Sequence, residues 1–522
     1  MLPAMPTPLR VIVAPAIVSF VLAGCGGGSA ATTPEDFHFP PQFLFGSAIA
    51  GFQVEMGCPT TKAAECDDPA SDWYAFITKP ELVADQGLYI HGDPPSTGPG
   101  FFELYPADLD RAARELHGNA LRQSIEWSRI FPTSTDAIEG YDALKKAASP
   151  AALAYYHALF AAMKARGLKP LVTLNHYSLP LWIHDVAACH ADINACKDKG
   201  WADRPRIVKE IAKYAGFVGR EFGGEVDLWA TLNEPFTAVV VAGFLFPTAQ
   251  RSNPPGVFLK TDAAKTAMTA MIEGHARMYD AVHAGDTVDA DGDGKAARVG
   301  IVYNLQAVSP DDPEDPVDQQ GVKNLSYVMN EMFLNGVARG DLDANIDGNV
   351  VHRDDLANRL DFLGINYYQR TIVQGTPQSF FPAVSPLLTF NLINLALDAD
   401  PKGLYEVIRF GQRYNVPMMI TETGVDDGKD DGSAPAWVVR TLGWVKRAIA
   451  DGAPVEGYFY WSLIDNYEWN HGMTWYMGLY GIDSRDPMKT RRPRKAVAAY
   501  SRIAQAGAIP DDLLEQYKLP PR

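Results

Sequence analysis

Short apolar runs, rich in β-branched and aromatic residues, recur along the chain from about Phe39 onward, and stretches with helical periodicity separate them. Near-continuous apolar runs are typical of parallel strands that are covered on both faces. Eight such strands alternating with helices predict a single α/β domain, a (β/α)8 or TIM barrel. The predicted strands are Phe43–Ala48, Ala120–Trp127, Pro170–Asn175, Leu228–Asn233, Val299–Asn304, Phe362–Tyr367, Met418–Thr421 and Gly457–Trp461.

One predicted helix shows how the sequence marks both ends of an element. Ser149 has the residue type of an N-cap, and Pro150 suits the first helical position because its missing N–H costs nothing there. Apolar residues then recur at helical spacing, and Gly167 is placed to end the helix. The stretches 52–100, 186–203 and 371–400 show no such pattern, and we expect long loops there, at the mouth of the barrel.

The first 24 residues are predicted to be a signal peptide. The apolar run 11–22 is shorter than the roughly 20 residues that a membrane span needs. It ends in Leu-Ala-Gly before Cys25, which resembles the lipobox of bacterial lipoproteins and implies cleavage before Cys25 and acylation of it. The alternative is ordinary cleavage near Ala30. We therefore expect export and a lipid anchor on a bacterial membrane, facing the periplasm or the cell surface. The expected order is tether 25–38, barrel 39–510 and tail 511–522.

Charge and cysteine content narrow the possible partners. Asp plus Glu number 63 and Lys plus Arg 46, a net charge of −17, so no nucleic-acid partner is expected. Four cysteines remain after Cys25, and their even number in an exported protein suggests disulfides. Their closeness favours the pairs Cys58–Cys66 and Cys189–Cys196, although the sequence also permits the other two connectivities. Spacings of eight and seven residues do not match a zinc site.

Polar residues follow several of the predicted strands, where side chains point into the mouth of a barrel. Glu234, in TLNEP, and Glu422, in ITETG, each close an apolar strand. A buried charge is costly unless it is paired, so an acid there needs a reason. For Glu234 and for Glu422, the alternative is a purely structural role, in which an Arg at the rim of the barrel pairs with the carboxylate. Two acids together, among amides and aromatic rings, favour a catalytic site. The mouth residues are Gln53, Arg122, His176, Asn233, Glu234, Asn366, Tyr368, Glu422, Trp461, Glu468 and Trp469.

These positions fall in motifs that resemble glycoside hydrolase family 1, the retaining β-glucosidase family. The resemblance runs from Phe39 to near Tyr500, and the motifs occur in the family's order. They are Phe39–Gly46 (FPPQFLFG), Phe52–Glu55 (FQVE), Leu121–Arg129 (LRQSIEWSR), Thr173–His176 (TLNH), Asp361–Tyr368 (DFLGINYY) and Trp461–Trp469 (WSLIDNYEW).

The resemblance implies a retaining mechanism with two carboxyl groups about 5–5.5 Å apart. It implies that Glu422 is the nucleophile and Glu234 the acid/base, and that Arg122 and Tyr368 support the ionised Glu422. Asn233 would bind the sugar 2-hydroxyl, and Asn366 would support the site. The other ring hydroxyls would be bound by Gln53, His176, Glu468 and the Trp469 indole, over a stacking floor formed by Trp461.

The expected activity is exo-acting hydrolysis of small β-glycosides or oligosaccharides, with terminal β-D-glucose as the unit released. A preference for β-galactosides or β-fucosides is the alternative within the family, and a non-catalytic sugar-binding protein is the alternative outside it. Transglycosylation would use the same intermediate. An ionised Glu468 would repel a 6-phosphate, which argues against a 6-phospho-glycosidase. Glu234 argues against the myrosinase branch of the family, where Gln stands at the acid/base position. Thr423, Tyr177 and Ser178 depart from the usual family residues, which puts the sugar preference in doubt.

No cofactor is expected. Asp289, Asp291 and Asp293 match the start of an EF-hand calcium loop, but its twelfth position would be Gly300 and lacks the bidentate Glu. A structural calcium ion and a solvated acidic turn before the fifth strand are both open interpretations of this segment. Neither gives the segment a catalytic role. The sequence does not indicate an oligomeric state.

Overall fold

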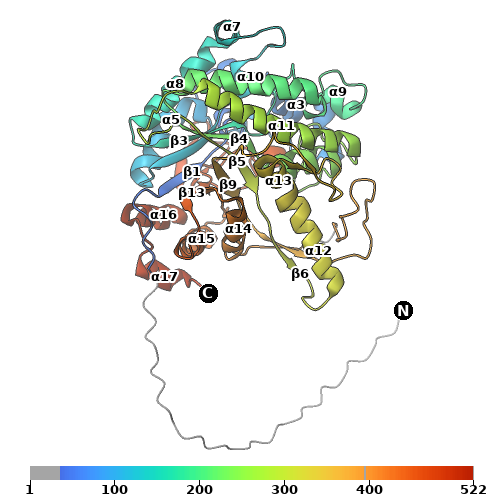
Figure 1. Cartoon of the computed structure of the whole chain (residues 1–522). Coiled ribbons are helices and arrows are strands. Elements are labelled where there is room, and N and C mark those ends of the chain that lie inside the picture. The colour runs from blue at the N-terminus through green and yellow to red at the C-terminus, as the bar shows by residue number, and fades with distance from the viewer. Residues whose placement is uncertain (1–35, 393–395, 521–522) are drawn as a thin grey trace, which may run out of the picture. The chain divides into compact units, whose positions relative to one another are not determined.

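Eight parallel strands form a closed barrel in the computed structural model, which describes residues 36–392 and 396–520. Strand β1 pairs with β2 on one side and with β13 on the other, so the first and last barrel strands complete the closure (Figure 1). The predicted (β/α)8 fold is confirmed. The barrel strands are β1 Leu44–Ala48, β2 Ala120–Ser124, β3 Lys169–Asn175, β4 Leu228–Asn233, β5 Arg298–Asn304, β9 Phe362–Asn366, β12 Met418–Glu422 and β13 Val455–Trp461.

Seven of the eight predicted strands differ from the observed ones by at most two residues at either end. The exception is Ala120–Trp127, because β2 leaves the barrel after Ser124 and the chain turns into a short helix at Trp127. Glu126 explains the turn, since its carboxylate accepts the backbone N–H of Phe52, on another segment, at 3.1 Å. A buried tertiary contact of this kind leaves no trace in the apolar pattern.

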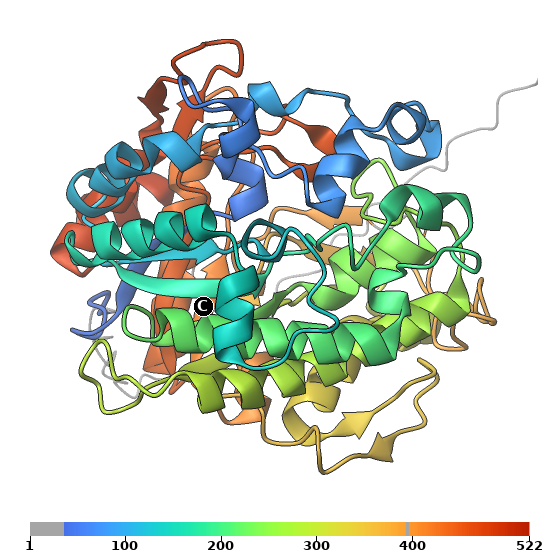
Figure 2. The ribbon, with the colours of Figure 1, turned by 90° about the horizontal axis from the view of Figure 1, so that it is seen from above.

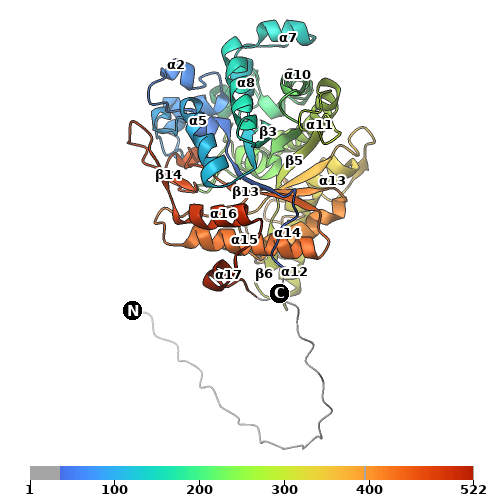
Figure 3. The same ribbon diagram turned by 90° about the vertical axis from the view of Figure 1, so that its left-hand side faces the viewer.

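Helices follow each barrel strand and surround the barrel, as Figures 2 and 3 show. The longest, α10 and α11, run side by side (Figure 1). The helices are α1 Gly51–Glu55, α2 Ala63–Cys66, α3 Asp72–Thr78, α4 Pro80–Val83, α5 Phe101–Asp110, α6 Trp127–Ile130, α7 Tyr141–Ala147, α8 Pro150–Lys164, α9 Val186–Ala191, α10 Arg204–Phe222, α11 Thr261–Gly285, α12 Pro316–Ser326, α13 Met332–Arg339, α14 Gly403–Gly411, α15 Ser433–Ala450, α16 Lys495–Ala506 and α17 Asp511–Tyr517.

Helix α8 has the predicted start. The Ser149 hydroxyl accepts the backbone N–H of Ala152 at 3.3 Å, which satisfies a donor that the first turn cannot pair internally. Tyr156 and Phe160, two of the residues at helical spacing, are fully buried. Gly167 has a φ of +70°, a left-handed conformation that an L-residue adopts only with strain, and the chain turns there toward β3.

The three stretches predicted as loops contain short elements, so that prediction was incomplete. Residues 52–100 include α1 to α4, where the Ser71 side chain caps α3 and Trp73 becomes fully buried. Residues 186–203 include α9, which Asp185 caps. Residues 371–400 contribute to a small sheet of β6 Ala307–Pro310, β10 Arg370–Val373 and β11 Ala396–Asp398. Helices of four to seven residues are too short to give a periodic signal.

Side chains from all eight strands form one apolar cluster, which includes Phe362, Met419 and Phe459. A cluster drawn from every strand can form only inside the barrel, so the interior is packed and closes the site from below. Gly46 of β1 makes room for this packing, because a Cβ there would overlap the Phe459 ring.

Cys58 is bonded to Cys66 and Cys189 to Cys196, which confirms the favoured pairing. The predicted signal peptide and Cys25 lie outside the described residues. At the other end, part of the predicted tail forms α17, which packs against α15 and buries Leu513. None of the helices in the described part of the chain combines the length and apolar character that crossing a membrane requires.

Candidate active site

The two predicted catalytic carboxyl groups lie at the carboxyl ends of two barrel strands. Glu422 is the last residue of β12, and Glu234 directly follows β4. In the barrel, β5 and β9 lie between these strands, and Asn366 ends β9. Glu422 is 4% exposed and Glu234 is 9% exposed. All three side chains therefore sit at the mouth of the barrel, largely out of water.

Glu422 is held by two donors on opposite oxygens. The Arg122 guanidinium forms an ion pair with Oε1, and the Tyr368 hydroxyl donates to Oε2 at 2.7 Å. Arg122 extends from β2, is fully buried, and donates through Nε to the Thr173 hydroxyl at 3.0 Å. A fixed cation and a hydroxyl donor stabilise an ionised carboxylate, so the site favours a negatively charged Glu422.

Glu234 has a different environment. Its Oε1 accepts the Asn366 amide at 2.8 Å, and its Oε2 accepts the Tyr177 hydroxyl at 3.2 Å. Burial, and then the negative charge of Glu422, raise the pKa of Glu234 to about 7. Its backbone is left-handed, with φ 41°, immediately before Pro235, a conformation that costs about 1–3 kcal/mol. Glu234 therefore keeps its proton up to a pH of about 7.

A hydrogen-bonded network joins the two carboxyl groups. Oδ1 of Asn233 accepts from Arg122 at 2.7 Å and from Asn366 at 3.2 Å. Arg122 also binds Glu422, and Asn366 also binds Glu234. The structure therefore brings both predicted carboxyl groups and the predicted supporting residues into one hydrogen-bonded cluster.

Gln53 and Glu468 form one wall of the predicted sugar site. The Gln53 amide donates to Glu468 Oε2 at 3.1 Å and to Asn466 Oδ1 at 2.8 Å. Burial raises the pKa of Glu468 to about 7, against the opposing influence of the Arg251 cation. Oε1 of Gln53 is buried and has no hydrogen-bond partner among the described residues, so it is available to a ligand hydroxyl.

His176 lies against both predicted tryptophans. Its ring centre is 5.8 Å from that of Trp461 and 5.7 Å from that of Trp469, nearly parallel to each. Burial and the Arg122 cation lower the pKa of His176 well below its usual value, so the ring is neutral. Nε2 lies 3.1 Å from the Asn233 amide nitrogen and accepts from it, which places the proton on Nδ1. In the described part of the chain Nδ1 has no acceptor, and it can donate to a sugar hydroxyl.

Two residues outside the predicted set also reach the site. The Tyr177 hydroxyl accepts the Asn233 amide at 2.8 Å and donates to Glu234, although the sequence indicated only that this residue departs from the family. Arg251 lies in the connection between the π-helix η5, Pro235–Leu245, and α11. Its segment has no motif or periodicity that could have identified it.

The acidic loop is part of a turn between α11 and β5. Asp289 accepts three backbone N–H groups from within the loop, and Asp291 forms an ion pair with Lys169. The carboxyl groups that approach one another are those of Asp289, Asp291 and Asp227, whereas Asp293 does not join them. These N–H groups fix the shape of the loop, and each carboxylate oxygen keeps a further lone pair, so a structural calcium ion and a solvated turn are both compatible with these contacts.

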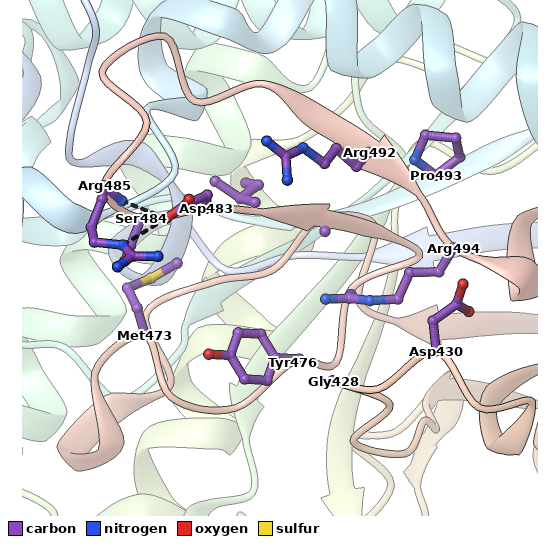
Figure 4. A pocket seen from close by; sticks show the side chains of 12 residues that line it. Gly428, Asp430, Met473, Tyr476, Asp483, Ser484, Arg485, Arg492, Pro493 and Arg494 are labelled. Carbon is purple, nitrogen blue, oxygen red and sulfur yellow. Dashed lines mark hydrogen bonds and ion pairs between the residues drawn. The ribbon is translucent and has the colours of Figure 1, made fainter.

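A cavity of about 490 Å³ lies between the connections that follow β12 and β13 (Figure 4). Arg485 faces Asp483 there, and Arg492 and Arg494 extend from the strand β15, Arg491–Pro493, and the residue after it. None of the predicted mouth residues lines this cavity. It is therefore distinct from the cluster around Glu234 and Glu422.

Comparison with known proteins gives consistent matches along most of the chain. Residues 35–508 match the model of the glycosyl hydrolase family 1. The β-galactosidase of Pyrococcus woesei is 34% identical over 521 aligned residues, which cover 92% of this chain and 99% of that protein. β-Glucosidase A of Thermotoga maritima is 28% identical, covering 85% and 93%. The solved β-glycosidase of Thermosphaera aggregans has a TM-score of 0.78 at 30% identity, covering 93% and 100%.

The environment of Glu234 predicts how activity depends on pH. With Glu234 as the acid, kcat/KM should fall as pH rises through about 7, because its proton is then lost. Tyr177→Phe removes a donor that stabilises the ionised carboxylate, so the pKa should rise and the falling limb should move to higher pH. Initial rates measured between about pH 4 and 10 test this shift.

The matched control is Tyr303→Phe, which removes the same hydroxyl from a buried tyrosine that donates to the Met329 carbonyl. It should leave the falling limb in place. A limb that stays fixed in Tyr177→Phe, or that moves equally in both variants, would contradict the assignment.

Proposed function

The chain belongs to glycosyl hydrolase family 1 and is a glycoside hydrolase that acts on O-glycosyl bonds, and we propose that it is a retaining, exo-acting β-glucosidase. The observation that carries the proposal is the pair of buried carboxyl groups, Glu234 and Glu422, joined through Asn233, Asn366 and Arg122. A retaining enzyme needs one ionised and one protonated carboxyl group on opposite sides of the bond to be cleaved. The environments of Glu422 and Glu234 favour these two different ionisation states. A non-catalytic sugar-binding protein would have no use for this difference.

In the first step, a Glu422 oxygen forms a bond to the anomeric carbon as the bond to the leaving oxygen breaks. Glu234 gives its proton to that oxygen, so the aglycone departs as a neutral alcohol. Arg122 and Tyr368 orient the Glu422 carboxylate for this attack. When the ester with Glu422 has formed, the charge that raised the pKa of Glu234 is gone, and Glu234 is left as a carboxylate.

In the second step, Glu234 removes a proton from water while the water oxygen bonds to the anomeric carbon and Glu422 is released. The sugar regains its original configuration after two inversions. Asn233 supports both steps, because its amide donor points toward His176 and Tyr177 and can be shared with the sugar 2-hydroxyl. That bond strengthens as positive charge develops on the ring.

The free polar atoms of the pocket support a neutral, terminal sugar as the group released. Gln53 Oε1 offers an acceptor and His176 Nδ1 a donor, and both are buried without a partner among the described residues. Bound hydroxyls would satisfy these groups, which otherwise cost free energy. Gln53 and Glu468 would enclose the hydroxyls farthest from the leaving group, so a further sugar there would collide with them. This supports exo-acting cleavage.

The choice between glucose and galactose depends on the orientation of one hydroxyl, at C4. The matched relatives include proteins named β-galactosidase and β-glucosidase, so family membership does not decide it. We propose glucose as the preferred sugar, with galactose and fucose as the alternative. A phosphorylated sugar is disfavoured, because the Glu468 carboxylate, when ionised, would repel a phosphate.

The nucleophile assignment predicts the product formed with azide. Glu422→Gly should reduce kcat by about 10⁴-fold or more, because the bond-forming group is lost. Azide should restore turnover of an aryl β-glucoside by occupying the vacated position, giving α-glucosyl azide. Glu234→Ala should instead give β-glucosyl azide, because the glycosyl-enzyme still forms. NMR of the products distinguishes the two anomers.

The control is Glu456→Gly, the same change on β13 at a half-exposed Glu paired with Arg298. This variant should keep wild-type kinetics. Full activity in Glu422→Gly, or the same azide anomer from both catalytic variants, would refute the two roles.

Sugar preference is tested with matched nitrophenyl β-glycosides of glucose, galactose, fucose, mannose and 6-phosphoglucose. The proposal predicts the highest kcat/KM for the glucoside. A higher value for the galactoside or fucoside would establish the alternative. Dominant turnover of the phosphorylated substrate would overturn the assignment of Glu468.

A further inference from the structure

Arg251 lies against three residues of the proposed sugar site. Its guanidinium carbon is 5.2 Å from the ring centre of Tyr177 and 5.4 Å from that of Trp469. Its Nη1 is 3.8 Å from Oε1 of Glu468. The side chain is 24% exposed, so its charge is only partly screened by water. The cation therefore acts directly on the carboxylate that faces the sugar.

The backbone around Arg251 is fixed on both sides. The N–H of Ser252 donates to Oδ1 of Asn470 at 3.1 Å, and His471 Nε2 lies 2.9 Å from the carbonyl oxygen of Gln250. Asn470 and His471 belong to the 3-10 helix η8, Trp469–His471, which directly follows Glu468. The loop carrying Arg251 and the loop carrying Glu468 are thus tied together, which keeps the two charges near each other.

The same cation also reaches the acid/base residue through one hydroxyl. Nη2 of Arg251 donates to the Tyr177 hydroxyl at 3.4 Å, and that hydroxyl donates to Oε2 of Glu234 at 3.2 Å. Arg251 therefore faces Glu468 directly and Glu234 through Tyr177. No other described cation contacts both Glu468 and the Tyr177 hydroxyl that leads to Glu234. Arg122 binds Glu422 and Asn233 instead.

A purely structural role would be to clamp the two loops. The contacts argue against this, because a clamping arginine is expected to pair closely with a carboxylate through two N–H groups. Arg251 has one long hydrogen bond and one ion pair at 3.8 Å within the described residues. Both lead to groups of the sugar site, and the guanidinium has donors left for a ligand.

We propose that Arg251 is a positioning residue of the sugar site, which holds the Glu468 carboxyl group toward the hydroxyls at the non-reducing end and favours its ionised form. This rests on the proposed function, since it gives Glu468 the role of binding a terminal sugar. An ionised carboxylate accepts stronger hydrogen bonds from hydroxyls than a protonated one does. Burial raises the pKa of Glu468 to about 7 even with this cation in place, so without the cation a larger fraction of Glu468 would be protonated at neutral pH.

Removing the cation should move both limbs of the pH profile in the same direction. A cation stabilises the ionised forms, so its loss raises the pKa of Glu468, which must be ionised to bind, and of Glu234, which must be protonated to act. The rising and falling limbs of kcat/KM should both move to higher pH. The groups that face these two carboxyl groups are Arg251, Glu422, Gln53, Tyr177, Asn366 and Tyr368.

The test compares Arg251→Met, which keeps a flexible chain over the rings but removes the charge, with Arg251→Lys, which keeps the charge. For an aryl β-glucoside, Arg251→Met should raise KM about tenfold and change kcat less than about threefold, with both limbs moved by about half a pH unit. Arg251→Lys should retain most of the wild-type behaviour. For the 4-deoxy glucoside and the xyloside, which lack hydroxyls facing Glu468, the rise in KM should be much smaller.

Arg485→Met is the matched control, because Arg485 is an exposed arginine that lines the separate cavity of Figure 4. It should behave as wild type. An equal loss of kcat/KM on all substrates in Arg251→Met, with an unmoved pH profile, would show that Arg251 only clamps the two loops and would overturn the proposal. Wild-type kinetics in this variant would also overturn it.

If Arg251→Met does not fold, Arg251→Gln provides the same comparison. Failure of the azide experiment would refute the proposed function separately, because it does not involve Arg251.

Discussion

Two carboxyl groups buried in one hydrogen-bonded cluster cannot both be ionised cheaply, and this electrostatic constraint organises the site. The structure resolves it by giving the two groups unequal partners. Glu422 receives a buried guanidinium and a hydroxyl, whereas Glu234 receives an amide and a hydroxyl but, within the described residues, no direct cation. Proximity of like charges and loss of water then place the proton on Glu234. The proposed division of labour between nucleophile and acid follows from the strand at whose carboxyl end each group lies.

The barrel gives Glu422 and Glu234 these different partners because it holds side chains from distant segments together at the carboxyl ends of its strands. Arg122 comes from a strand that lies 244 residues before Asn366 and 300 before Glu422 in the sequence, yet parallel pairing brings the carboxyl ends of the three strands together. The apolar interior, with Phe459 packed where Gly46 leaves room, supports the site from below. Longer connections after β1, β4 and β13 then add the sugar-facing groups.

The fold and the chemical core of the site could be predicted from the sequence because each depends on a local pattern. Apolar runs located all eight strands, and an acid at the end of an apolar run identified Glu234 and Glu422. The residues that escaped prediction act through tertiary contacts alone. Arg251 approaches Glu468 only because two loops meet, and Asp227, not Asp293, joins the acidic turn because β4 begins beside it. Short helices such as α3 were missed since seven residues carry too little periodicity.

The central claim is that Glu422 becomes covalently bound to the sugar, and trapping that ester tests it most directly. An activated 2-deoxy-2-fluoro-β-glucoside weakens the interaction with Asn233 and slows release of the sugar, so the intermediate should accumulate. Mass spectrometry of the digested protein should then find one fluoroglucosyl group, attached to the peptide that contains Glu422. Labelling of Glu234 or of another residue, or rapid turnover that releases the inverted sugar with no labelled peptide, would contradict the account.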